Sequence, residues 1–537
     1  MSLRNRINNI PVKYFYFLAF GLIIPAMFIN LGLLTFLEDE SIRALVALEM
    51  KFSGNLIVPT LNGTYYYYKP PLYNWIILVF YNLFNDVSPW TARFVTVINL
   101  LAFTITVFLV NKRYLNKHQS ILIALVFITC GRIIFWDSML AYIDISYSWV
   151  TYVEIMSIFI FYKQKKYWHL FIVSYVLMSI GFMMKGYTSI AFQGLSLVSF
   201  FIWKKEFKRL FSLANFVGLG LFVLIVGGYY LAYSQYNSIE RTFSPLLDQS
   251  IRRTAMHKTI DLWQTVKHIF TYPFDNIYHF LPWSLMIIMV FSKRSIRAIL
   301  NNEFVVFNVI MFIVNISVYW VSVEVYPRYI LMLAPMIFTV YIYMYDIHFS
   351  ERTILVRILN ALFLLLFLGI FVFSFLPYFE ERVWLNENYL LKTIFLNVSI
   401  LTLGVVYYLR KRNKLIVIVL LVLVVRVGYD WFVLTGRRRE SPGFDKQAIS
   451  IGKRYKSEEL YIYKKSKIDY TASYYIARER DKITTRKFSD FIPQEYFLFD
   501  TSHYELDTIK FEIVEEFRER EFDRTIFVVK PKSHFID

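Results

Sequence analysis

The residues best suited to chemistry lie in one polar stretch, residues 38–75, between two hydrophobic parts of the chain. This stretch opens with an acidic pair, Asp39 and Glu40, and approaches its end with Lys69, which precedes two prolines. A carboxylate can take a proton from an attacking group, and a lysine can neutralise a phosphate. An acid and a base at the two ends of one loop between hydrophobic segments therefore indicate chemistry at a membrane surface.

Each of these residues also has a structural interpretation. Acidic residues such as Asp39 and Glu40 are favoured at the N-terminus of a helix, and Arg43 would share a helical face with Asp39 and could be oriented by it. The tyrosines at 65–68 are typical of an aromatic belt at the headgroup level, and Lys69 could extend to lipid phosphates without a specific role. The choice between a catalytic and a structural role depends on which other charged groups reach the same side of the membrane.

The composition predicts a polytopic membrane protein. Of the 537 residues, 57% are hydrophobic and 18% are charged, and the mean hydropathy is +0.45. Apolar runs of about twenty residues, the length that spans a hydrocarbon core, recur as far as residue 435. The net charge of +18 lies mostly in short loops between these runs, which favours topology signals and anionic lipid over nucleic acid as a partner. Cys130 is the only cysteine, which excludes a disulfide or a thiolate metal site.

The hydrophobic pattern predicts about thirteen transmembrane helices. We place them near 14–37, 91–111, 119–136, 144–162, 167–184, 186–203, 210–233, 276–292, 303–323, 328–345, 353–377, 389–409 and 414–434. Basic clusters fall in alternate loops, on the side of the N-terminus: Lys112/Arg113/Lys117, Lys163/Lys165/Lys166, Lys204/Lys205/Lys208/Arg209, Lys293/Arg294/Arg297, Arg352/Arg357 and Arg410/Lys411/Arg412/Lys414. The positive-inside rule then predicts a cytoplasmic N-terminus.

The opposite loops therefore face the non-cytoplasmic side: residues 38–90, the turn 137–144, the turn at Lys185, the segment 234–275 and the turn 324–328. An odd number of spans puts the tail beyond Gly436 there too. We expect a transmembrane domain at 1–436, with interfacial helices in its first outer loop, and a small α/β domain at 437–537. Strand and helix signals alternate in this tail at 459–464, 469–480, 495–500, 511–517 and 525–530.

Further charged residues reach the same outer face from distant parts of the chain. Asp144 starts the fourth predicted span, where it could cap the helix or act as a second carboxylate, with Asp137 as its competitor. Lys185 and Arg328 occupy outer turns against the positive-inside trend, which favours an anionic ligand.

Two carboxylates and several cations on one membrane face are what a transferase with a phosphate-linked lipid donor needs. The cations stabilise the phosphate, and a positioned carboxylate deprotonates the acceptor. A polyprenyl phosphate leaves readily, so that one catalytic carboxylate suffices. A divalent metal would be compatible with this chemistry, but the scattered histidines have no metal-ligand spacing that supports one.

The first outer loop also resembles that of a known family. The residues DESIR, EM, SGNLIVPTLNG and YYYKPPLYNW, in unbroken register, are similar to a motif of polyprenyl-phosphate-dependent membrane glycosyltransferases. This family includes the lipid A aminoarabinose transferases and the dolichyl-phosphate-mannose–protein mannosyltransferases. Weaker similarity continues at Asp144, at Lys185-Gly186 and at Arg328-Tyr329-Ile330.

The resemblance implies Asp39 as the catalytic base and Asp144 as a second acid near the acceptor or the donor sugar. It implies that the lipid phosphate is bound by Lys69, Arg43, Lys185 and Arg328, with Glu40, Tyr68 and Tyr329 as further candidates. Two positions depart from the family pattern. Ile42 stands where the family has its arginine, and Tyr68 replaces the acid before the lysine, which argues against a metal ligand there.

The resulting hypothesis is a glycosyltransferase that moves a sugar from an undecaprenyl-type phosphate to an acceptor outside the cytoplasm. Lipid A, another glycolipid and a protein hydroxyl all remain open as acceptors, and the resemblance favours a bacterial inner membrane. The alternative is a transporter or lipid flippase, which would have charges at mid-membrane and an inverted repeat. Only Arg426 lies well inside a predicted span, and no repeat is evident. A non-catalytic scaffold would leave the clustered acids and bases unexplained.

Overall fold

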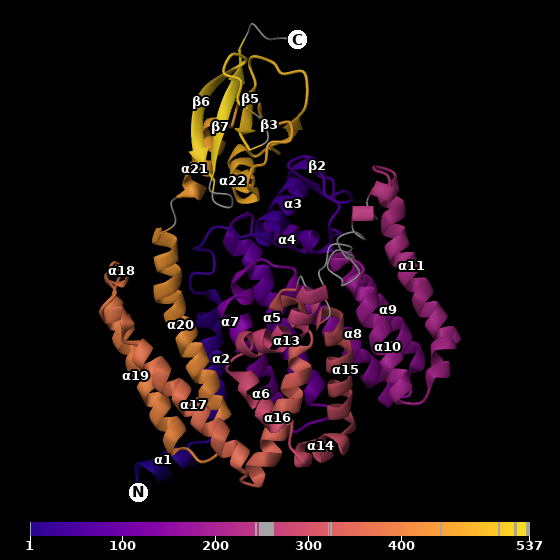
Figure 1. Ribbon diagram of the computed structural model, residues 1–537, viewed down its shortest axis with the longest axis vertical. Coiled ribbons are helices and arrows are strands. Elements are labelled where there is room, and N and C mark those ends of the chain that lie inside the picture. Colours follow the sequence, from indigo (N-terminus) through magenta and orange to yellow (C-terminus); the bar gives the residue numbers. More distant parts are fainter. Residues whose placement is uncertain are drawn as a thin grey trace.

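The computed structural model describes residues 2–241, 244–245, 262–320, 322, 325–440, 443–502, 505–519 and 524–532. It shows a bundle of long helices with a small sheet domain at one end (Figure 1). The N-terminal helix α1 (Leu3–Asn9) lies at the opposite end of the bundle, the end where the basic helix α14 (Lys293–Leu300) also lies. The described N-terminal and C-terminal parts of the chain thus lie at opposite ends of the bundle. Part of the predicted outer segment 234–275 lies outside the described residues.

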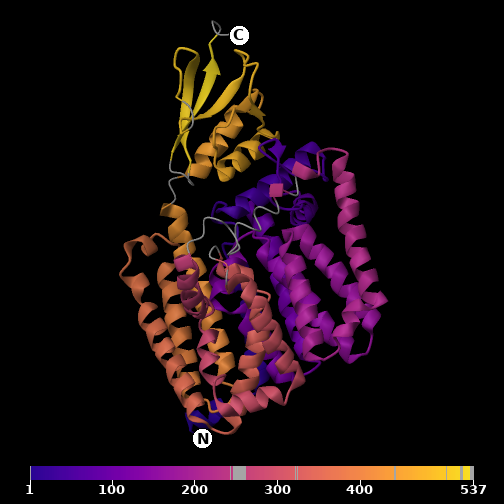
Figure 2. The ribbon, with the colours of Figure 1, turned by 45° about the vertical axis from the view of Figure 1, so that its right-hand side comes forward.

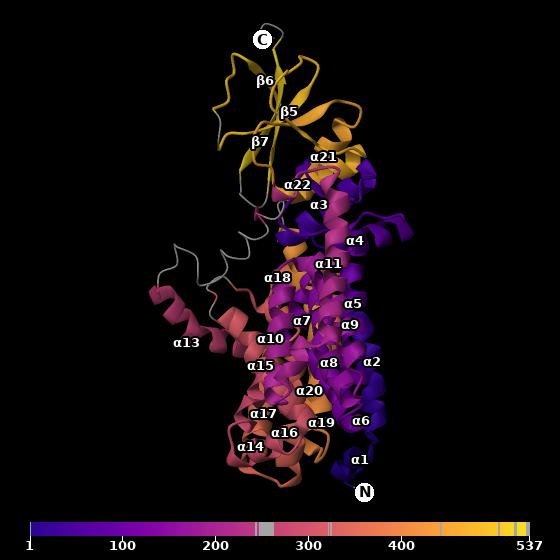
Figure 3. The ribbon, with the colours of Figure 1, turned by 90° about the vertical axis from the view of Figure 1, so that its right-hand side faces the viewer.

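Eight helices in the described part of the chain are long and apolar enough to cross a membrane, which confirms the polytopic fold. They are α5 (Pro89–Asn111), α8 (Asp144–Lys163), α9 (Tyr167–Lys185), α11 (Leu213–Ser234), α15 (Glu303–Trp320), α17 (Ile354–Phe373), α19 (Tyr389–Leu409) and α20 (Leu415–Glu440). Each coincides with one of the predicted spans. Figures 2 and 3 show them packed side by side in one slab.

The remaining predicted spans fall on bent or shorter elements. Two bent pairs raise the number of crossings to as many as ten among the described residues: α1 (Leu3–Asn9) with α2 (Val12–Phe28), and α6 (Lys117–Ile128) with α7 (Gly131–Phe135) and η1 (Asp137–Met139). The other three predicted spans correspond to α10 (Thr188–Trp203), to the 3₁₀ helix η3 (Trp283–Met289) and to α16 (Ala334–Ser350). These are shorter than the roughly twenty residues of a full helical crossing.

Several short elements connect the spans. They are η2 (Phe207–Phe211), α13 (Leu262–His279), α14, η4 (Pro327–Ile330), η5 (Leu376–Tyr378) and α18 (Glu381–Trp384). Of these, η4 matters most for function, because it carries Arg328 at the outer end of the bundle.

The first outer loop folds into two helices and a hairpin. Helix α3 (Asp39–Ser53) ends at Gly54, whose φ of 70° closes the helix, and α4 (Leu72–Leu83) begins directly after the proline pair. Between them, β1 (Thr60–Leu61) pairs antiparallel with β2 (Thr64–Tyr65). The turn residues Asn62 and Gly63 have φ values of 52° and 68°, as expected of the Asn-Gly type I′ hairpin. The loop therefore brings its acidic start and basic end back to one place.

The C-terminal part forms the predicted small α/β domain. Its sheet has the order β4-β3-β5-β7-β6, with β3 parallel to β4 and β5, and β7 antiparallel to β5 and β6. The elements are α21 (Phe444–Arg454), β3 (Leu460–Tyr463), α22 (Tyr470–Arg480), β4 (Arg486–Lys487), β5 (Tyr496–Asp500), β6 (Phe511–Arg518) and β7 (Thr525–Pro531). The two helices lie under the sheet, toward α3 (Figure 1).

Candidate active site

Two helix N-termini place the predicted carboxylates beside one arginine. Asp39 is the first residue of α3 and Asp144 the first residue of α8. Arg328, on η4, reaches both: its Nη2 lies 3.0 Å from Asp39 Oδ2 and its Nε lies 3.4 Å from Asp144 Oδ2. Burial opposes the charge of Arg328, but Asp144, followed by Tyr329, Tyr142 and Asp39, outweighs it and raises the pKa of the guanidinium above its ordinary value. Arg328 is therefore a permanent cation between the two acids.

Lys185 is the second cation on Asp144. It is the last residue of α9, which Gly186 ends with a φ of 78°, and its Nζ lies 2.5 Å from Asp144 Oδ1. The same Nζ lies 4.0 Å from the centre of the Tyr329 ring. The Asp144 side chain is only 6% exposed, whereas that of Asp39 is 57% exposed. The two carboxylates thus have different surroundings: Asp144 is enclosed by cations, and Asp39 faces open space.

These groups, apart from Arg328, line one cavity of about 160 Å³. The predicted site residues along its wall are Asp39, Arg43, Tyr68, Lys69, Asp144, Lys185 and Tyr329, and the wall is completed by Ile42, Leu61, Tyr66, Tyr142, Ile143 and Tyr470. Lys69 contributes to the electrostatic field at Asp144. Residues that are far apart in the sequence therefore meet in one cation-rich pocket.

Arg43 lines this cavity but does not have the partner expected of it. Its guanidinium donates a hydrogen bond to the hydroxyl of Tyr66 and lies 5.1 Å from the centre of the Tyr66 ring. Asp39, which shares its helical face, is instead paired with Arg328. The expectation that Arg43 and Asp39 orient one another is corrected accordingly.

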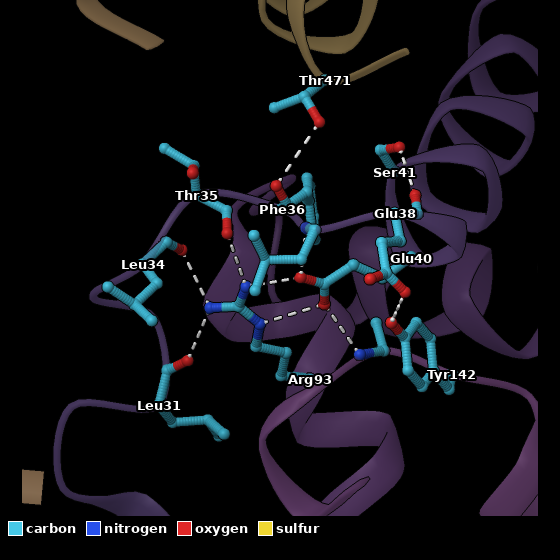
Figure 4. A network of polar contacts seen from close by, with 12 residues as sticks. Leu31, Leu34, Thr35, Phe36, Glu38, Glu40, Ser41, Arg93, Tyr142 and Thr471 are labelled. Carbon is cyan, nitrogen blue, oxygen red and sulfur yellow. Dashed lines mark hydrogen bonds and ion pairs between the residues drawn. The ribbon is translucent and has the colours of Figure 1, made fainter. Parts of the chain in front are cut away.

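Glu40 does not line the cavity and instead takes part in a buried network of polar contacts. Its side chain is fully buried, and it forms an ion pair with Arg93 of α5, whose Nη2 lies 2.7 Å from Glu40 Oε1 and whose Nε lies 3.1 Å from Oε2 (Figure 4). The carboxylate also accepts hydrogen bonds from the backbone N–H of Leu37 and of Ala141, at 2.6 and 2.9 Å. Glu40 therefore ties the segment before α3 to the turn before Asp144.

Arg93 completes this network from below. It donates hydrogen bonds to the carbonyls of Leu31, Leu34 and Thr35, at 3.0, 2.9 and 2.9 Å, and so holds the segment between α2 and α3 (Figure 4). Beside it, Tyr142 donates a hydrogen bond of 3.0 Å from its hydroxyl to Glu38. Hydrogen bonds between residues next to Asp39 and residues just before Asp144 thus fix the positions of these two acids relative to one another.

The hairpin that leads to Lys69 is fastened to α3 by Glu49. This buried carboxylate accepts hydrogen bonds from Thr60 Oγ1 at 2.6 Å, from Asn62 N at 2.6 Å and from Gly63 N at 3.2 Å. Burial raises its pKa to about 7, although the three hydrogen bonds act in the opposite direction. Glu49 is therefore more easily protonated in the folded protein than in the unfolded chain.

This shift predicts a hairpin that loosens as the pH rises. The stabilisation that comes with the raised pKa is complete below the ordinary value of 4.5 and is lost as the pH rises through about 7. The loss is on the order of 3 kcal/mol, so hydrogen-exchange protection of the Asn62 and Gly63 amides should fall by about 100-fold between pH 4.5 and 8. A Glu49→Gln variant, neutral throughout, is the control and should show a flat protection profile. Parallel profiles for the two proteins would contradict the prediction.

Sequence reasoning missed several residues that shape the site. Arg93, Tyr142, Glu49 and Tyr470 were not among the candidates. A signal existed for Arg93, because a charge inside a predicted span indicates a buried partner. The other residues carry no such signal, since their contacts arise only from folding. Asp137, the competitor of Asp144, is paired instead with Arg132, whose Nε lies 2.9 Å from its Oδ2.

The fold and the site together define a polytopic membrane protein with a cation-rich pocket at the end of its spans that carries the C-terminal domain. Among the described residues, no group of three or more His, Cys, Asp or Glu side chains is arranged to hold a metal ion. The pocket is built from the first outer loop, two spanning helices, η4 and the C-terminal domain.

Comparisons with known proteins agree with this description. Residues 68–229 match the family model of the dolichyl-phosphate-mannose-protein mannosyltransferases. The fold is similar to that of ArnT from Cupriavidus metallidurans in the apo state, with a TM-score of 0.70 and 15% identity over 96% of this chain and 98% of that one. A structure of the same protein bound to undecaprenyl phosphate gives a TM-score of 0.69 at 15% identity, covering 97% and 99% of the two chains. The family match thus begins at Tyr68, near the end of the first outer loop, and the two ArnT structures show that the fold is shared.

Two sequence relatives match only part of this chain. An uncharacterized protein of Aquifex aeolicus is 23% identical over 260 residues, which are 48% of this chain and 57% of the relative. A second one from the same organism is 21% identical over 308 residues, 56% of this chain and 59% of the relative. The chain thus spans less than two thirds of the length of these relatives.

Proposed function

We propose that the chain is an integral-membrane glycosyltransferase that moves a sugar from a polyprenyl phosphate to an acceptor outside the cytoplasm. The observation that carries this proposal is the pairing of one exposed carboxylate, Asp39, with a cation-lined pocket at the membrane surface. The likeness of the fold to ArnT, which was solved with undecaprenyl phosphate bound, supports the donor class. The family match and the fold match give no support to the alternative of a transporter or flippase.

In this proposal, the two ends of the first outer loop have separate roles. Lys69, Lys185 and Arg328 bind the phosphate, which takes over part of the attraction that these cations exert on the carboxylates. Asp39 then accepts the proton of an acceptor hydroxyl as its oxygen attacks the anomeric carbon. The bond between that carbon and the phosphate oxygen breaks, and the polyprenyl phosphate leaves as an anion. The cations stabilise its charge.

The enclosure of Asp144 distinguishes it from Asp39. Because it is almost fully buried between Lys185 and Arg328, it serves to hold these cations at the phosphate rather than to exchange protons with the acceptor. The expected role of Asp144 as a second acid is refined to that of a residue that positions the cations.

The orientation belongs to the same proposal. The basic loops favour an N-terminus in the cytoplasm, so that the pocket and the C-terminal domain would face the periplasm of a bacterial inner membrane. The acceptor is a glycolipid such as lipid A or a protein hydroxyl, and membrane lipids surround the bundle.

Donor binding tests the proposal directly. A Lys69→Ala variant should bind undecaprenyl phosphate about 10- to 100-fold more weakly, because a hydrogen bond to a charged group contributes about 1.5–3 kcal/mol. The measurement is a titration of the detergent-purified protein with undecaprenyl phosphate, followed by native mass spectrometry.

A matched control comes from the same loop. Lys51, near the end of α3, forms an exposed hydrogen bond of 2.9 Å with Asn82 and does not belong to the cavity wall. Lys51→Ala should therefore bind the lipid like the wild type. Equal affinities for the Lys69→Ala variant and the wild type would remove Lys69 from the phosphate site.

A further inference from the structure

The C-terminal domain is fastened to the segment that carries the catalytic carboxylate. Thr471, in the first turn of α22, donates a hydrogen bond of 3.4 Å from its Oγ1 to the carbonyl of Phe36 (Figure 4). The Phe36 ring meets that of Tyr474 edge to face, at 4.8 Å between centres. Phe36 stands three residues before Asp39, so α22 is packed against the entry to α3.

A second contact joins the same domain to the hairpin that leads to Lys69. A Cβ atom added at Gly63 would lie 2.5 Å from Thr485 Cγ2, and the φ of Gly63 is 68°. Only glycine fits there, because both the conformation and the neighbouring chain exclude a side chain. The C-terminal domain thus touches the first outer loop on both sides of the site.

Between these contacts, Tyr470 reaches the cavity itself. Among the described residues that line the pocket, it is the one that comes from the C-terminal domain. Its place is set by the start of α22: the Asp469 side chain accepts a hydrogen bond of 2.9 Å from Thr471 N, and Asp469 N donates one of 2.6 Å to Glu519 Oε2. Tyr470 is therefore held at the wall by residues on both sides of it.

The size of the cavity limits what Tyr470 can contact. At about 160 Å³, it is comparable to an engineered cavity of about 150 Å³ that takes up one benzene ring. That is room for one six-membered ring, such as the ring of a monosaccharide at the reacting end of the donor, but not for a complete glycolipid. A tyrosine offers such a ring an apolar face and a hydroxyl that both donates and accepts hydrogen bonds. The phosphate of the donor is assigned to the cations, which leaves Tyr470 opposite the sugar.

We propose that Tyr470 is a specificity residue that contacts the transferred sugar, so that the C-terminal domain takes part in choosing the donor. This inference rests on the proposed function, because it assumes a sugar-bearing polyprenyl phosphate in the pocket. It assigns the domain a place in the active site in addition to its packing on the first outer loop.

The test compares two kinds of lipid on the full-length protein. Undecaprenyl phosphate and a panel of undecaprenyl-phosphate monosaccharides (glucose, mannose and arabinose) are titrated against the wild type and the Tyr470→Ala and Tyr470→Phe variants. The wild type should bind at least one sugar-bearing lipid about 10-fold more tightly than the bare one. Tyr470→Ala should lose this preference, with the affinity for the bare lipid kept within about twofold, and Tyr470→Phe should keep part of it.

The control is Phe488→Ala, which truncates an aromatic side chain that is 53% exposed on the same domain and should leave both affinities unchanged. A preference retained in Tyr470→Ala would overturn the proposal. So would an equal loss for both lipids, which would indicate a packing role, or a wild type that prefers none of the sugar-bearing lipids over the bare one. Failure of the proposed function is seen separately, as a bare lipid that binds equally well with and without Lys69.

Discussion

Replacing Asp39 with asparagine should lower sugar transfer by at least about 100-fold, the lower end of the contribution of a general base. Asparagine has nearly the same shape, and its carbonyl oxygen can still accept a hydrogen bond from Arg328, but it cannot take a proton from the acceptor. The side chain is 57% exposed and its ion pair with Arg328 is open to solvent on one side, so the fold should lose little stability. The measurement is transfer from the lipid extract of the producing strain to its envelope acceptors, with the purified variant in liposomes.

Measuring lipid binding by the Asp39→Asn variant distinguishes loss of the catalytic base from loss of the phosphate-binding site. The Asp39→Asn variant should bind undecaprenyl phosphate as tightly as the wild type, because its phosphate-binding cations are unchanged. Asp481→Asn is the matched control: this acid, 65% exposed, forms a surface ion pair with Lys456 in the C-terminal domain and should leave transfer unaffected. Full activity of the Asp39 variant would overturn the assignment of the base, though not the family to which the chain is similar.

Replacing Arg93 with glutamine should have the largest effect on stability. The ion pair with Glu40 is almost completely buried, with 2% of Arg93 and none of Glu40 exposed. Removing one partner of a buried pair costs about 3–5 kcal/mol, because the other charge stays buried without compensation. Three backbone carbonyls before α3 would lose their donor at the same time. The apparent free energy of unfolding in detergent should fall accordingly, and transfer should be lost with it.

Two comparisons identify the cause of this loss. A double variant, Glu40→Gln with Arg93→Gln, removes both charges and should recover a measurable part of the stability. Arg209→Gln breaks an ion pair with Glu206 in which 40% of Arg209 and 32% of Glu206 are exposed, and it should change the stability by less than about 1 kcal/mol. If Arg93→Gln lost as little stability as Arg209→Gln, the buried ion pair between Arg93 and Glu40 would not be what stabilises the site.

Much of the architecture follows from local pattern. The eight longest spans agree with predicted segments because twenty apolar residues have few other stable conformations next to lipid. In the C-terminal domain, the alternating signals at 459–464 and 495–500 correspond to β3 and β5, which are neighbours in the sheet. The Asn62-Gly63 pair specifies its hairpin in the same way. Such features depend on residues within one turn or one strand, which a sequence displays directly.

The length of the spans is less predictable. The segment predicted at 276–292 contains the end of α13 and the 3₁₀ helix η3 instead of one continuous helix, with Pro282 between them. A proline removes a backbone donor and disfavours helix in the residue before it. Hydropathy averages do not register this break, because the residues around it remain apolar.

By itself, the sequence determined the polytopic membrane fold, the chemical types of the residues in the pocket and the loop that carries Asp39 and Lys69. Only the tertiary structure decided which charges pair. Arg328 meets an aspartate 289 positions away, Glu40 belongs to Arg93 and not to the pocket, and Tyr470 enters the cavity from another domain. The physical reason is that an ion pair depends on distances of a few ångströms between groups on different helices. Those distances are set by how the helices pack, which no local pattern of residues contains.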